Sequence, residues 1–373
     1  MAKKLNERIT QDKLSQVAFQ IFQITRKESA FISFIAILLF IAGIVTPYPQ
    51  IAMWFGFAMA GYSAIANDSI QTIGTFISSN SRQKWYYLWL FMGLIFLITV
   101  TYSWIVYSGD VSHQRLQAKG FSEAPDHFSF LQITAPIILL IITRMRMPVS
   151  TSILLLSAFS SQGTAIVGVL QKSLSGYFVA FIVAIIIWFL VSRFVSKFLH
   201  KKPAKYWRIL QWITSGALWS AWIMQDAANV AIFLPRELNI YQFIAFAGYI
   251  FLGLGLLFYL KGDRIQSIVE EKSGVKDVRA ATLVDFIYAI ILYYFKIISV
   301  VPMSTTWVFI GLLGGRELAI SISKKRAKKR KKSIKSTMLM IGRDALYALI
   351  GLVISLLLAF AINADLRDAV VGN

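Results

Sequence analysis

Two acidic residues lie inside long apolar stretches of the sequence. Asp68 follows the run GFAMAGYSAIAN, and Asp226 lies within WIMQDAANVAIF. A charged group in hydrocarbon is costly unless it has a partner, so such residues usually mark ion or substrate sites. Each carboxylate has amide side chains nearby, and carboxylate and amide oxygens suit a hard cation such as Na⁺, while a carboxylate can instead carry a proton. The candidate cation-binding residues are Asn67, Asp68, Gln71, Gln225, Asp226 and Asn229.

A second pair of motifs is rich in hydroxyl groups. The sequence reads MPVSTS at 147–152 and VPMSTT at 301–306. Proline breaks helices, so we expect the chain to turn within the membrane at Pro148 and Pro302, with the hydroxyls at the start of a new helix. Free backbone N–H groups and the positive dipole end of a helix bind anions, so two such helix starts would cradle a tetrahedral oxyanion. The candidate anion-binding residues are Ser150, Thr151, Ser152, Ser304, Thr305 and Thr306.

The two kinds of motif recur in the same order along the chain. Asp68 precedes Ser150 by nearly the same number of residues as Asp226 precedes Ser304, which indicates an internal duplication. In the topology predicted below, the two copies cross the membrane in opposite directions. A cation site beside an anion site, at the interface of an inverted repeat, is typical of ion-coupled symporters.

The elements that must position these residues are long apolar helices. The chain has 373 residues, of which 57% are hydrophobic and 15% are charged, whereas a soluble domain is about 25% charged. Its apolar stretches match the roughly 20 residues that span a bilayer as a helix. The predicted fold is an all-α integral membrane protein, an inverted-repeat secondary transporter with two broken helices and two re-entrant hairpins. The predicted segments are 30–47, 50–77, 85–107, 128–143, 148–170, 174–194, 207–234, 238–260, 281–301, 302–322 and 337–363.

Composition also argues against several classes of protein. The sequence has no cysteine, which excludes disulfides and thiolate metal sites, and its three histidines are scattered in polar loops. A net charge of +20 would indicate nucleic-acid binding in a soluble protein. Here the basic residues gather in loops on one side of the predicted membrane, as the positive-inside rule requires. We therefore expect no nucleic-acid partner, no enzymatic activity and no cofactor other than a coupling ion.

The same charge pattern predicts the orientation and the domains. We place the N-terminus inside and the C-terminus outside, in the cytoplasmic (cell inner) membrane of a bacterium, and we treat 128–143/148–170 and 281–301/302–322 as hairpins that return to the side they came from. The predicted domains are an interfacial amphipathic arm over 1–29, a first membrane repeat over 30–194, a basic cytoplasmic linker over 195–206, a second, inverted repeat over 207–363 with a basic loop at 324–335, and a tail over 364–373.

The paired motifs resemble those of the PiT family of inorganic phosphate transporters. That family has two copies of Gly-Ala-Asn-Asp-x-x-Asn and two of Pro-Val-Ser-Thr-Thr-His. This sequence has IANDSIQ at 65–71 and IMQDAAN at 223–229, with PVSTSI at 148–153 and PMSTTW at 302–307. The resemblance spans nearly the whole chain through the order and spacing of the motifs. It implies import of inorganic phosphate driven by Na⁺ or H⁺, an inverted-repeat fold and commonly a homodimer.

The resemblance also assigns roles by position. The two Pro-x-Ser-Thr motifs would hold the phosphate, and the two acidic motifs would hold the coupling ion. The expected partners are therefore inorganic phosphate or sulfate, Na⁺ or H⁺, membrane lipid and a second copy of the chain. The implied phosphate ligands are Ser150, Thr151, Ser304 and Thr305, with Ser152 and Thr306 as neighbours, and the implied Na⁺ ligands are Asn67, Asp68, Asp226 and Asn229.

The sequence departs from the family pattern in both kinds of motif, and neither acidic motif starts with glycine. Gln71 and Gln225 stand where the family has asparagine, and their longer side chains would shift or loosen the coordination of an ion. Ile153 and Trp307 stand where the family has histidine. Related family members move sulfate, so a carrier of sulfate or another oxyanion is the first alternative. A polytopic membrane enzyme acting on phosphate groups, with the two carboxylates as metal ligands or as acid and base, is the second.

Three basic residues lie shortly before the hydroxyl motifs. Arg144 and Arg146 precede the first motif, and Lys296 precedes the second. Such side chains either attract an anion toward the helix starts or extend into the interface or a water-filled vestibule. We expect the second arrangement.

Overall fold

The computed structural model of the protein contains helices and no strand in the part of the chain that it describes. The predicted arm before residue 28, most of the tail, Arg146 and Pro148 lie outside this part, and so do the side chains of residues 67–71 and 191–198. The described residues are 28–118, 120–145, 147, 149–160, 162–198, 203–260, 277–324, 326–363 and 367.

In the first half of the chain, the first hydroxyl motif lies between the end of α5 and the start of a second π-helix, and α7 follows it. The described part of the chain begins with the helix Glu28–Val45, and the next helix changes to π geometry at the first acidic motif. The elements are α2 (Pro49–Ser63), a π-helix (Ala64–Asp68), α3 (Ser69–Ser79), α4 (Trp85–Val106), a 3-10 turn (Arg115–Gln117), α5 (Phe130–Arg144), a second π-helix (Ser152–Leu156), α6 (Ser157–Phe159) and α7 (Gly163–Phe198).

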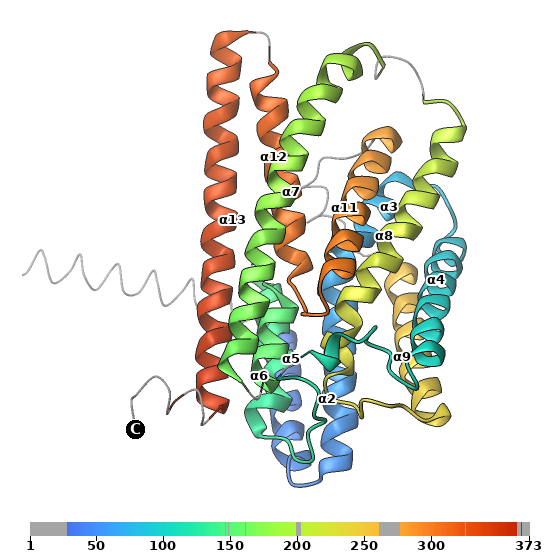
Figure 1. Ribbon diagram of the computed structural model, residues 1–373, viewed down its shortest axis with the longest axis vertical. Coiled ribbons are helices and arrows are strands. Elements are labelled where there is room, and N and C mark those ends of the chain that lie inside the picture. The colour runs from blue at the N-terminus through green and yellow to red at the C-terminus, as the bar shows by residue number, and fades with distance from the viewer. Residues whose placement is uncertain are drawn as a thin grey trace, which may run out of the picture.

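The helices of the second half are longer and pack against those of the first. In Figure 1, α7, α12 and α13 stand side by side along one edge of the molecule, while α4 and α9 form the opposite edge with α8 and α11 between them. The bounds of these elements are α8 (Tyr206–Ala231), α9 (Ile240–Tyr259), α11 (Val278–Ile298), α12 (Thr305–Ile322) and α13 (Ala327–Ile362).

The helices have the length and surface of a membrane protein. Large apolar side chains point away from the bundle: Ile98 and Ile105 on α4 are 69% and 67% exposed, and Leu252 on α9 is 66% exposed. Such a surface is typical of helices that face lipid rather than water. By length and composition, six helices in the described residues can cross a membrane, namely Glu28–Val45, Trp85–Val106, Gly163–Leu190, Ile240–Tyr259, Val278–Ile298 and Ala327–Ile362.

Both hydroxyl motifs lie where the chain reverses its direction. α5 starts at a capping box formed by Ser129 and Gln132, and the Gln132 amide also donates to the Ala158 carbonyl at 3.1 Å. This bond places the beginning of α5 beside the end of α6, so the chain reverses its direction between the end of α5 and Thr151, and we call this reversal the first hairpin tip. In the second half, the turn between α11 and α12 lies about halfway along the long axis of the molecule (Figure 1).

Three features of the predicted segments are wrong in detail. No boundary separates 148–170 from 174–194, because α7 runs without interruption through Lys172. The second helix with an acidic motif is not broken, because α8 keeps its α-helical geometry through Asp226 and ends only before Pro235. Most of the basic run 324–335 belongs to α13 rather than to a loop. In all three places the chain lacks the proline that would interrupt a helix.

Two glycines allow α12 to lie directly against α7. A Cβ on Gly311 would lie 2.4 Å from the Tyr177 carbonyl oxygen, and one on Gly315 would lie 2.2 Å from the Phe181 carbonyl oxygen. The two glycines are one helical turn apart, and so are the two carbonyls that they meet. Small residues at this spacing let helix backbones approach closely inside a membrane. The contact fixes the helix that begins at the second hydroxyl motif against the helix that follows the first.

We predict that Gly315→Ala, and to a similar extent Gly311→Ala, lowers the melting temperature of the purified protein in detergent. The added methyl meets backbone that cannot rotate away, and overpacking of this kind costs about 1–3 kcal/mol. Gly248→Ala in α9 is the matched control, since nothing lies within 4 Å of its added carbon. Equal melting temperatures for the Gly315 and Gly248 variants would contradict the close contact.

Candidate functional site

Asp226 lies at the point where the two hydroxyl motifs meet. It is 1% exposed, and its two carboxylate oxygens accept hydrogen bonds from different halves of the chain. Ser152, from the first motif, donates to Oδ1 at 3.0 Å, and Thr305, from the second, donates to Oδ2 at 2.5 Å. Asn229, one turn further along α8, donates to Oδ1 at 2.9 Å. A single carboxylate therefore joins both hairpin tips to α8.

Each tip has the form that its sequence predicts, a serine that caps a new helical segment. The Ser150 hydroxyl accepts from the Ile153 backbone N–H at 3.0 Å, and the Ser304 hydroxyl accepts from the Trp307 backbone N–H at 3.2 Å. A serine at this position satisfies a backbone donor that the helix leaves free. The hydroxyls are thus at the positive ends of two helical segments, a short one that begins with the second π-helix and the longer α12, as the motifs predict.

The two tips also contact each other directly. The Thr306 hydroxyl donates to the Val149 carbonyl at 3.3 Å, and the Ser304 backbone N–H donates to Ser173 on α7 at 2.8 Å. All six predicted anion-binding residues are buried, with exposures between 1% and 4%, so they lie together inside the protein. They are Ser150, Thr151, Ser152, Ser304, Thr305 and Thr306.

The second acidic motif has oxygen atoms available for a cation. The side-chain oxygens of Gln225 and Asn229 are buried and have no hydrogen-bond partner among the described residues. Their amide nitrogens are occupied, since Gln225 donates to the Leu292 carbonyl at 2.9 Å and Asn229 donates to both Ser152 and Asp226. Buried acceptors without a partner are rare. With the adjacent carboxylate, these two amide oxygens form a set of hard ligands that suits a small cation.

The first acidic segment lies beside this set. A cavity of about 30 Å³ is lined by Asp226 and by Ala64 and Ile65, which belong to the π-helix that contains the first motif. This volume suffices for a water molecule, for which about 10–15 Å³ is enough. The described residues thus bring the two acidic segments together. The predicted ligands Asn67, Asp68 and Gln71 have side chains outside the described part, so their roles stay predictions.

The arrangement of the helices matches that of a known transporter. A solved structure described as "The sodium-dependent phosphate transporter" aligns with 86% of this chain and 98% of its own, with a TM-score of 0.51 and 19% identity. The two chains share a fold. The resemblance to phosphate transporters that the motifs predict is therefore confirmed at the level of the fold. No protein-family profile matches the sequence, and neither does any curated protein.

Two of the basic residues near the hydroxyl motifs have defined partners. Arg144 forms an ion pair with Glu28 at 2.6 Å and lies over the Phe31 ring at 5.2 Å, so it ties α5 to the first helix rather than facing the tips. The Lys296 amine donates to the His113 carbonyl at 3.4 Å, on the inner side of the loop between α4 and α5.

A second buried carboxylate was missed in the sequence. Asp285 on α11 is fully buried and accepts from Thr75 at 2.7 Å and from Ser215 at 2.5 Å. The signal that points to Asp226, a lone carboxylate in an apolar helix, is equally present in LVDFIYAII at 283–291. Unlike the segment that holds Asp226, the segment at 283–291 has no matching motif in the other half of the chain.

A chain of amides leads from Asp285 to an open cavity. Ser215 accepts from Gln211 at 3.2 Å, and Gln211 accepts from Asn80 at 2.7 Å. Asn80 lines a cavity of about 870 Å³ together with Arg82, Lys205, Arg208 and Asp277. The polar network therefore connects a buried carboxylate to one end of the bundle.

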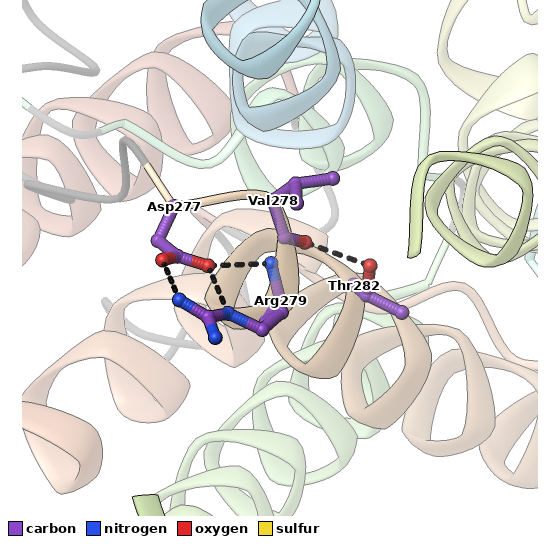
Figure 2. Close-up of polar contacts among 4 residues, drawn as sticks. All are labelled: Asp277, Val278, Arg279 and Thr282. Carbon is purple, nitrogen blue, oxygen red and sulfur yellow. Dashed lines mark hydrogen bonds and ion pairs between the residues drawn. The ribbon is translucent and has the colours of Figure 1, made fainter. Parts of the chain in front are cut away.

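The rim of this cavity is organised by the first residues of α11. Figure 2 shows Asp277 accepting from the backbone N–H and the guanidinium of Arg279, at 2.9 Å to Oδ1 and 2.6 Å to Oδ2. The Arg279 hydrogen bonds hold the pKa of Asp277 below its usual range. Asp277 is therefore ionised at neutral pH, and it caps the helix that carries Asp285.

We predict that Ser215→Ala destabilises the protein by about 1–3 kcal/mol, because it leaves a buried carboxylate oxygen without its donor. The measurement is the melting temperature in detergent. Ser175→Ala is the matched control, since this exposed serine donates only to the Gln171 carbonyl of its own helix. Adding Asp285→Asn to Ser215→Ala removes the unpaired charge and should restore part of the loss. A Ser215 variant as stable as the Ser175 variant would contradict the network.

Proposed function

We propose that this protein is a secondary active transporter that imports inorganic phosphate together with Na⁺ or H⁺. The observation that carries the proposal concerns the carboxylate of Asp226, which accepts hydrogen bonds from hydroxyl groups of both hairpin tips at once. The shared fold with a sodium-dependent phosphate transporter supports it. The oxyanion would bind the two hydroxyl motifs, and the cation would bind the carboxylate and the amide oxygens beside it.

The geometry suggests why the two solutes would be coupled. In the structure, the hydroxyls of Ser152 and Thr305 donate to Asp226. An arriving oxyanion competes with this carboxylate for the same donors, and it brings a second negative charge into a buried site. Two adjacent anions are strongly unfavourable at low dielectric. A cation on the carboxylate and the amide oxygens, or a proton on the carboxylate, removes the repulsion, so the anion would bind well only together with its companion.

The same carboxylate favours phosphate over sulfate. Phosphate at neutral pH keeps a proton that it can donate, whereas sulfate only accepts hydrogen bonds. Asp226 offers an acceptor next to the hydroxyl donors, and an acceptor without a matching donor is left unsatisfied. We propose phosphate as the substrate for this reason. We also propose that the two halves cross the membrane in opposite directions and that each contains a re-entrant hairpin. We further propose that the N-terminus lies inside and that the protein is a homodimer.

The direct test is uptake of radiolabelled phosphate into proteoliposomes, with a Na⁺ gradient, a proton gradient or neither. We expect saturable uptake with one of the two gradients and competition by excess sulfate that is at least about tenfold weaker. Asp226→Asn should abolish the dependence on the gradient, because a neutral amide can neither take up a proton nor balance the charge of a bound cation. Asp126→Asn is the control for an exposed carboxylate of the same kind. Gradient-driven uptake by Asp226→Asn at the wild-type rate would contradict the cation role.

The hydroxyl role has its own test. We predict that Thr305→Val raises the KM for phosphate by about tenfold or more, since hydrogen bonds to charged groups contribute roughly 1.5–3 kcal/mol. Thr305→Ser keeps the hydroxyl and should keep the KM near its wild-type value. If the two variants have equal KM values, the Thr305 hydroxyl does not bind the anion.

A further inference from the structure

Two basic side chains converge on the peptide segment just ahead of the second hydroxyl motif. The Arg115 guanidinium and the Lys172 amine both donate to the carbonyl of Ser299, the lysine at 3.0 Å. Lys172 also donates to the carbonyl of Val301. Arg115 comes from the loop between α4 and α5, and Lys172 comes from α7. Two basic side chains from distant parts of the chain therefore meet at one backbone oxygen.

The loop that carries Arg115 is built to point inward. The carboxylate of Asp110 accepts from the backbone N–H groups of Ser112 at 2.7 Å and Gln114 at 2.6 Å. His113 and Gln114 have φ angles of 53° and 64°, a left-handed conformation that side chains other than glycine seldom adopt. Strained backbone of this kind gathers at functional sites. The result is a loop that delivers Arg115 into the bundle with 0% exposure.

A third basic side chain adds to the pair. Lys296, on the last turn of α11, reaches the same loop through the carbonyl of His113. Arg115 and Lys296 both lie close enough to Lys172 for their charges to act on it. Burial lowers the pKa of Arg115 to about 10, which leaves its guanidinium charged at neutral pH. Burial also lowers the pKa of His113 to about 4, so its imidazole is neutral.

The described residues supply no ion-pair partner for these three side chains. Asp226 and Asp110 are close enough to act on Arg115 and Lys296 through their charge. Asp226 is occupied by hydroxyl and amide donors, and Asp110 by backbone N–H groups. One terminal nitrogen of Arg115 is buried and has no acceptor among the described residues, while the other two guanidinium nitrogens donate to the Met224 and Ser299 carbonyls. A buried charged donor without an acceptor is strongly unfavourable.

We infer that Arg115, Lys172 and Lys296 form a second anion subsite, distinct from the hydroxyl tips, that takes a tetrahedral oxyanion. A guanidinium and two amines that lie close together, with one guanidinium nitrogen that has no acceptor among the described residues, are the chemistry that binds phosphate or sulfate. The subsite adjoins the second tip, because the Ser299 and Val301 carbonyls belong to the segment that leads into Ser304. Its place on the route of the substrate rests on the proposed function. Binding of the anion itself does not.

The test is equilibrium binding of radiolabelled phosphate, and separately of sulfate, to the purified full-length protein in detergent at fixed ionic strength. Lys296→Gln should weaken binding by about tenfold, and Lys296→Arg should bind as the wild type does. Lys172→Gln is a second variant in case the first disturbs folding, which the melting temperature checks. Lys84→Gln is the control, because this exposed lysine lies at the opposite end of α4 from the Arg115 loop.

Each outcome decides the inference. Weaker binding in both glutamine variants, with the control unchanged, supports the subsite. Wild-type affinity in both glutamine variants, or no binding of phosphate and sulfate to the wild type, overturns it. Uptake by the same proteins separates the two proposals: a raised KM with an unchanged kcat places the subsite on the substrate route. Binding that depends on the lysines without any gradient-driven uptake keeps the subsite and rejects phosphate import.

Discussion

The arrangement of the hairpin tips depends on one buried carboxylate. The two carboxylate oxygens of Asp226 accept hydrogen bonds from Ser152 and Thr305. Each of these donors lies shortly after a serine, Ser150 or Ser304, that caps a helical segment. A buried carboxylate needs such donors, because an unpaired charge in the interior is strongly unfavourable. The same bonds that hold the halves together are the bonds that an oxyanion would replace.

The rest of the fold keeps these tips in place. The glycines of α12 bring it against the backbone of α7, and Ser173 of α7 accepts from the backbone of Ser304. The Tyr288 hydroxyl donates to the Thr305 carbonyl at 2.8 Å, so α11 holds the same turn from its other side. The tip is therefore held by packing and by hydrogen bonds that do not involve its hydroxyl groups. Those hydroxyls remain available to exchange partners.

Most of the candidate site could be predicted from the sequence, because its signals are local. A carboxylate in an apolar stretch and a proline before hydroxyls indicate Asp226 and Ser304 without any knowledge of the fold. The continuity of α7 through Lys172 was not predictable, because a lysine between apolar runs is typical of a loop. Its amine is satisfied by carbonyls from a segment far along the chain. Arg115 was missed for the same reason: nothing in a polar loop indicates that its backbone folds inward.

The two sites have opposite electrostatic character, and their adjacency has a consequence. Arg115 is near enough to Asp226 for the two charges to attract, which lowers the free energy of the ionised carboxylate. An oxyanion bound by Arg115, Lys172 and Lys296 would screen that attraction and so raise the free energy of the bare carboxylate. The carboxylate then gains more by taking up a cation or a proton. Under the proposals above, an anion at the basic cluster would promote binding of the companion ion before the anion reaches the hydroxyl tips, so coupling would begin one step ahead of the central site.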